Sequence, residues 1–257
     1  MSRFVNLEFN NEFEDQSHRP PVVKDGKYYF SAAQAAFGEM QFEQSLRCYS
    51  KVLEFDPLNV AAWTGQVRAL IELGEFREAK LWADKALEKF PNEPELLAGK
   101  AVALGRTGDL QGALAFSDAS IEERGDTYYI WLARGDVLLA REEKRADYCF
   151  DKALTLAPKD WLVAWLSARI RFYYKKFSLA LKSAQQALEW NPASAVLWLQ
   201  VGLCQKELGL IGLARTSLEQ ARQLDPRCEG TDRALLEISE ASWLSRARGW
   251  LRKLSDR

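Results

Sequence analysis

Apolar residues follow a helical period along most of this chain, and the clearest example lies within residues 60–93. Trp63, Val67 and Leu70 are spaced three or four apart, so they share one face of a predicted helix. Gly74 follows this stripe and predicts the end of the helix, because glycine readily adopts the conformation of a helix cap. A second stripe then runs through Phe76, Ala79, Ala83 and Ala86 and stops before Pro91. The pattern predicts a helix–turn–helix unit.

The same skeleton returns when the sequence is shifted by about 34 residues. Within residues 195–228, Trp198, Gly202, Gly209 and Pro226 occupy the matching places. Self-similarity at this period is typical of a solenoid, in which each unit buries its apolar face against its neighbours. We expect six units, at 26–59, 60–93, 94–127, 128–160, 161–194 and 195–228.

These recurring positions resemble the tetratricopeptide repeat (TPR). The features that carry the resemblance are a tryptophan, a small residue four positions later, a glycine at the turn, alanines in the second helix and a closing proline. The resemblance covers about residues 26–228 and implies an all-α fold, a right-handed α–α superhelix of about six helical hairpins. Two copies depart from it, since Met40 stands in place of the turn glycine and the turn at 142–144 contains no glycine.

In the TPR family the first helix of each hairpin lines a concave groove, so the resemblance implies a partner-binding surface on this chain. Phe172 and Tyr173 have an alternative interpretation as core residues packed against the next repeat. The implied groove residues are Phe30, Gln34, Thr64, Arg68, Val102, Arg106, Tyr129, Leu132, Asp136, Trp165, Arg169, Phe172, Tyr173, Leu199 and Lys206. Aromatic side chains with isolated arginines suit a peptide that has apolar anchors and acidic flanks.

One TPR subclass binds the C-terminal carboxylate of chaperones through a lysine and asparagines at fixed places of the first helices. At these places the chain has Phe30, Ser31 and Gln34 in the first copy, and Thr64 and Gly65 in the second. The resemblance therefore does not extend to this clamp, and binding of chaperone tails is not expected.

The predicted N-terminal tail, residues 1–25, shows no helical period. Its apolar residues Phe4, Leu7, Phe9 and Phe13 alternate with acidic ones. One interpretation is a disordered terminus, and the other is an extended peptide that docks on the protein's own groove, in the same or a neighbouring molecule.

Residues 229–257 form the predicted C-terminal segment, with a helix from about Thr231 to Lys253 that covers the last repeat. Its end is basic and carries Trp243 and Trp250. Covering the last repeat is the favoured interpretation, and attachment to an acidic membrane surface is the alternative.

Composition narrows the function further. The chain of 257 residues has a formal net charge of −1, which argues against a protein built to bind nucleic acid, although some helical repeats of similar length do bind RNA. Its four cysteines have no metal-ligand spacing and His18 is the sole histidine, so no metal, cofactor or histidine-based catalysis is expected. No N-terminal signal or anchor pattern is present, and we expect a cytoplasmic protein–protein interaction scaffold without enzymatic activity.

Overall fold

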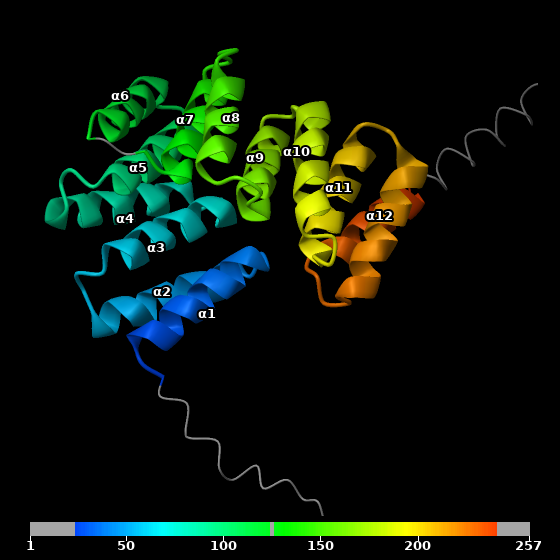
Figure 1. The fold of residues 1–257 in the computed structure, drawn as a ribbon, viewed down its shortest axis with the longest axis horizontal. Coiled ribbons are helices and arrows are strands. Elements are labelled where there is room, and N and C mark those ends of the chain that lie inside the picture. The colour runs from blue at the N-terminus through cyan, green and yellow to red at the C-terminus, as the bar shows by residue number, and fades with distance from the viewer. Residues whose placement is uncertain (1–23, 124–125, 241–257) are drawn as a thin grey trace, which may run out of the picture.

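The structure is a computed structural model that describes residues 24–123 and 126–240. It is an all-α solenoid in which consecutive helices pack as antiparallel hairpins, as the repeat pattern predicts (Figure 1). The helices are α1 (Gly26–Gly38), α2 (Phe42–Phe55), α3 (Val60–Leu73), α4 (Phe76–Lys89), α5 (Pro94–Thr107), α6 (Leu110–Glu122), α7 (Tyr128–Ala140), α8 (Ala146–Leu156), α9 (Trp161–Tyr173), α10 (Phe177–Trp190), α11 (Ala195–Glu207) and α12 (Ile211–Leu224).

Both predicted terminal segments lie largely outside the described residues. The predicted docking residues of the tail, Phe4, Leu7, Phe9 and Phe13, are among those outside. Residues 231–240 are helical, and Ala234 and Ile238 are buried against Leu199 and Leu218 of the last repeat. This part of the predicted terminal helix therefore covers the end of the solenoid.

The turns inside the hairpins share one backbone conformation, a residue with positive φ, whether or not that residue is glycine. Gly74 and Gly108 have φ of 82° and 95° and cap α3 and α5 in the left-handed conformation. Met40, Glu142 and Lys175 have φ of 62°, 59° and 58° at the three turns that have no glycine at this place. The residues other than glycine adopt a conformation that is unfavourable for L side chains, because the packing of the hairpin requires it.

The signature residues pack against one another across the repeats. The indole N–H of Trp63 donates to the carbonyl of Pro57 at 3.0 Å, and that of Trp198 donates to Pro192 at 2.9 Å, so each tryptophan is tied to the turn before its own helix. The small residue four positions later makes room for a large side chain of the second helix. A Cβ added at Gly135 would lie 2.8 Å from the Phe150 ring, which explains why glycine stands there.

The solenoid curves until its first repeat meets its fifth. The turn between α1 and α2 lies beside α9 (Figure 1), where the rings of Phe42 and Trp165 stack with centroids 6.3 Å apart. Phe37, Phe42 and Trp165 are buried in one core that continues to Leu197 on α11. Met40 packs against the next core, beside Cys228. The groove implied by the resemblance is therefore not open where the first and fifth repeats share this buried core.

Candidate functional site

The fifteen implied groove residues divide into three groups by exposure. Gln34 and Tyr173 are exposed, with Tyr173 47% accessible. Partly buried side chains are Phe30, Arg68, Arg106, Arg169, Phe172 and Lys206. The buried ones are Thr64, Val102, Tyr129, Leu132, Asp136, Trp165 and Leu199. These seven do not have the implied exposure. Leu132 and Trp165 lie in the core that includes Phe37 and Phe42 of repeat 1, whereas Leu199 packs against Leu218 and Ile238. A role of the set in partner binding stays a prediction.

A buried ion pair holds α5 against α7 inside the hollow. The guanidinium of Arg106 donates to both carboxylate oxygens of Asp136, at 3.0 and 2.6 Å. The hydroxyl of Tyr174 donates to the same carboxylate at 2.7 Å. Burial raises the pKa of Tyr174, and the negative charge of Asp136 raises it further, so this phenol stays a donor. Asp136 is therefore a structural acceptor shared by two donors.

A second ion pair joins the fifth repeat to the second across the hollow. Nε of Arg169 on α9 donates to the Glu72 carboxylate at the end of α3, at 2.5 Å, and both side chains are mostly buried. The same guanidinium lies 5.0 Å from the ring centre of Phe42 and 5.2 Å from that of Trp165. Arg169 thus joins the fifth repeat to the second through charge and to the first through an aromatic ring.

An open groove remains along the helix turns, and we name it the turn-side groove. It combines a cavity of about 170 Å³ below Tyr173 with a cleft of about 650 Å³ between repeat 1 and the start of the terminal helix. Glu72, Leu73 and Arg169 line both, so the cavity and the cleft adjoin at these residues. The other lining residues are Ile71, Gly74, Phe76, Arg106, Ile170 and Tyr173 in the cavity, and Met40, Gln41, Phe42, Glu43, Gln44, Arg47, Glu229, Gly230 and Arg233 in the cleft.

Exposed aromatic surface stands at one end of this groove and exposed charge at the other. Phe76 packs edge-on against Tyr173, with ring centroids 6.1 Å apart. The guanidinium carbon of Arg106 lies over the Tyr173 ring, 3.4 Å from its centre. At the far end, Arg47 is 81% exposed in its side chain and Arg233 is exposed. Such an arrangement can hold an apolar side chain at Tyr173 and acidic groups near the arginines.

Several residues that line the turn-side groove are not among the fifteen that the sequence implied. Glu72 occupies the thirteenth place of its repeat, which the family pattern assigns to the groove, so that signal could have identified it. Arg47 and Arg233 carried no comparable signal, because α2 and the terminal helix reach the groove only through closure of the solenoid.

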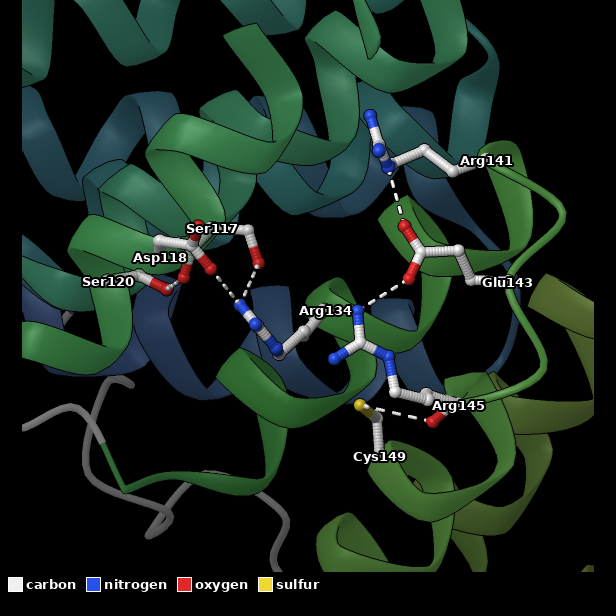
Figure 2. A network of polar contacts seen from close by, with 8 residues as sticks. All are labelled: Ser117, Asp118, Ser120, Arg134, Arg141, Glu143, Arg145 and Cys149. Atoms are coloured by element: carbon white, nitrogen blue, oxygen red, sulfur yellow. Dashed lines mark hydrogen bonds and ion pairs between the residues drawn. The ribbon is translucent and has the colours of Figure 1, made fainter. Parts of the chain in front are cut away.

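A separate polar network reinforces the glycine-free turn between α7 and α8 (Figure 2). Glu143 accepts hydrogen bonds at 2.7 Å from both Arg141 and Arg145, and these bonds hold its pKa below the usual range. On the neighbouring helix pair, Arg134 of α7 donates to Asp118 of α6 at 2.7 Å and to Ser117 at 3.2 Å. These contacts connect neighbouring helices, and we assign the network a structural role.

The cysteines are thiols without disulfide partners in the described part of the chain. Burial raises the pKa of Cys149 and Cys204 to about 11, so neither is a thiolate near neutral pH. Within residues 24–123 and 126–240, no group of three or more His, Cys, Asp or Glu side chains is arranged to hold a metal ion. None of the helices in those ranges has the length and apolar character required to span a bilayer.

Comparison with known proteins gives distant relatives. The chain is 25% identical over 199 residues to the Hsp70-Hsp90 organizing protein of Triticum aestivum, across 76% of this chain and 34% of the relative. It is 24% identical over 207 residues to Hsp70-Hsp90 organizing protein 1 of Glycine max, across 76% of this chain and 35% of the relative. The chain thus spans about a third of the length of these curated relatives.

Solved structures agree on the fold. TTC0263, a thermophilic TPR protein of Thermus thermophilus, superposes with a TM-score of 0.54 at 18% identity, over 70% of this chain and 99% of the other. The APC/C hetero-tetramer Cut9-Hcn1 gives a TM-score of 0.52 at 17% identity, over 83% and 43%. At such low identity these similarities show the arrangement of helices alone.

A family model described as tetratricopeptide repeat matches residues 36–103, which include the clearest copy of the repeated pattern. The periodic skeleton, the stacked helical hairpins and this match lead to one conclusion: the chain contains tetratricopeptide repeats, and its described residues form a TPR-like helical solenoid.

Proposed function

We propose that this protein is a non-catalytic scaffold that binds an extended segment of a partner protein in the turn-side groove. The observation that carries the proposal is that an open cavity and an open cleft adjoin at Glu72 and Arg169, beside the core that joins the first and fifth repeats. An extended chain fits a long, narrow groove, whereas a folded partner would meet mainly the convex face.

The lining favours a particular kind of segment. Tyr173 and Phe76 offer an apolar docking point, and aromatic residues of this kind are common binding hot spots. Arg47 and Arg233 at the other end favour acidic residues, and Arg47 has only a long contact of 3.5 Å to the exposed Glu43. We therefore expect a partner segment with an apolar anchor followed by carboxylates.

Replacing Tyr173 by alanine should weaken binding of such a segment about tenfold or more, because truncation of an aromatic anchor commonly costs over 1 kcal/mol. The measurement is calorimetric titration of the full chain with peptides selected from a displayed library. Tyr148→Ala is the matched control: Tyr148 is 64% exposed on α8, outside the groove. Equal affinity of the Tyr173 variant and the parent protein would place the binding surface elsewhere.

The N-terminal tail is a candidate occupant of the same groove in the absence of a partner. Phe4, Leu7, Phe9 and Phe13 with the neighbouring carboxylates have the chemistry that the groove favours. Deleting residues 1–20 should then tighten peptide binding several-fold and increase hydrogen exchange at the ends of α3 and α9, since a competing segment is removed. Unchanged affinity and exchange in the shortened chain would reject the tail as an occupant.

A second candidate is recognition of chaperone C-terminal carboxylates, favoured by the names of the curated relatives. The positions that form the carboxylate clamp in other TPR proteins are Phe30, Ser31 and Gln34 here, and Thr64 is buried. We therefore favour the turn-side groove over a clamp as the binding site. An Hsp90-derived C-terminal peptide, compared with its C-terminally amidated form in the same titration, separates the two: a clamp requires the free carboxylate, whereas the groove depends on side chains.

A further inference from the structure

Arg68 is a cation on α3 that points into the hollow and lies among aromatic rings. Its guanidinium carbon is 4.3 Å from the ring centre of Tyr129, 5.3 Å from that of Phe37 and 5.8 Å from that of Tyr128. No carboxylate of the described residues forms an ion pair with it. Arg68 therefore differs from Arg106 and Arg169, each of which has its own carboxylate in the hollow.

The carboxylates around this site are engaged by donors other than Arg68. Arg68, Arg106 and Arg169 face the hollow, and the acidic residues opposite them are Glu72 and Asp136, which are already paired. Glu95 acts on Arg68 electrostatically from outside the cavity and accepts a hydrogen bond from Thr127 instead. The carboxylate of Glu95 acts on Arg68 without reaching ion-pair distance, so the guanidinium of Arg68 has no direct carboxylate partner among the described residues.

A partly buried charge without an ion-pair partner is unfavourable, because its loss of hydration is only partly offset by contact with aromatic rings. Arg68 lines a cavity of about 30 Å³, which has room for about two water-sized groups, or the two oxygens of a carboxylate. Ile71, Glu72 and Ile170 line both this cavity and the turn-side groove, so the cavity adjoins the groove at these residues.

We infer that Arg68 is the receptor for one carboxylate of the partner, carried by an aspartate or glutamate side chain that enters the hollow from the turn-side groove. The inference rests on the proposed function and makes it more specific: the partner segment places its acidic residue beside its apolar anchor at Tyr173. The guanidinium then gains an ion-pair partner, which no described residue of this chain provides at contact distance.

The test compares Arg68→Met with Arg171→Met in the full chain. Arg171 is a matched control because its guanidinium also lies over a ring, 4.4 Å from that of Phe150, but is paired with Asp147 at 2.8 Å. Methionine at Arg68 removes an unpaired charge, so the melting temperature of the free protein should rise by about 2–4 °C. Arg171→Met should lower it, since Asp147 and Ser183 lose their donor. A fall at Arg68 as large as that at Arg171 would overturn the inference.

The ligand chemistry is tested separately with sodium acetate, exchanged for sodium chloride at constant ionic strength. The Nε–H signal that disappears from the NMR spectrum in Arg68→Met should shift saturably with acetate, while that of Arg171 should not. An Arg68 signal that does not respond would contradict a carboxylate site, whatever peptides the protein binds.

A peptide that contains glutamate and its glutamine counterpart distinguish this site from the groove itself. The parent protein should prefer the glutamate peptide about tenfold, and Arg68→Met should bind both equally. If Tyr173→Ala abolishes binding while Arg68→Met retains the preference, the groove stands and the inference fails. If acetate moves the Arg68 signal in a chain that binds no peptide, the carboxylate site stands and the proposed function fails.

Discussion

Replacing Trp165 by alanine should lower the free energy of unfolding by about 3–5 kcal/mol, the range for truncating a large side chain in a close-packed core. Trp165 has no accessible surface, and its ring stacks on Phe42 from the first repeat and lies 6.5 Å from that of Trp161. The substitution would leave a cavity where the two ends of the curve meet. Chemical denaturation followed by circular dichroism measures the loss.

Two variants control for the size of the residue and for its polar atom. Trp131→Ala removes a partly buried tryptophan from the fourth repeat and should cost less than half as much. Trp165→Phe should also cost much less than alanine, because the buried indole N–H of Trp165 has no acceptor among the described residues and its removal relieves that penalty. Equal losses for Trp131→Ala and Trp165→Ala would show that the contact between the first and fifth repeats adds no stability.

Removing the carboxylate of Asp136 should also destabilise the protein by about 3–5 kcal/mol, the range for breaking one partner of a buried ion pair. Asp136 is 2% exposed and accepts from both Arg106 and Tyr174. In Asp136→Ala the guanidinium of Arg106 would stay buried without its counter-charge. The free energy of unfolding, measured by denaturant titration, checks the expected loss.

The double variant Arg106→Met with Asp136→Leu separates charge pairing from packing. It removes both charges and fills the space with apolar side chains, so most of the loss should be recovered. Tyr174→Phe alone should cost about 1 kcal/mol, since it removes one donor from a carboxylate that keeps its bond to Arg106. A double variant as unstable as Asp136→Ala would mean that the shape of these side chains, rather than their charge, holds α5 to α7.

The sequence alone determined the helical hairpin that repeats along the chain, because the residues that specify each hairpin lie close together in the sequence. The spacing of Trp63, Val67 and Leu70 defines a helix face, Gly74 ends the helix, and Gly135 allows Phe150 to approach. Each relation lies within one repeat or between neighbours, so the helix pairs and their order could be predicted. Of the fifteen residues implied for the groove, Arg106, Arg169 and Tyr173 line the cavity that remains open, and their role in binding stays a prediction.

Only the tertiary structure decided how far the solenoid curves, because curvature is the sum of small rotations between successive repeats and no single repeat specifies it. These rotations together bring Phe42 against Trp165 and Glu72 against Arg169. Glu72 and Arg169 are 97 positions apart in the sequence. The curvature turned part of the expected binding surface into core and left the turn-side groove open. The displaced tryptophan of the fifth repeat, Trp165 with Ala164 in the usual place, was the one sign of this in the sequence.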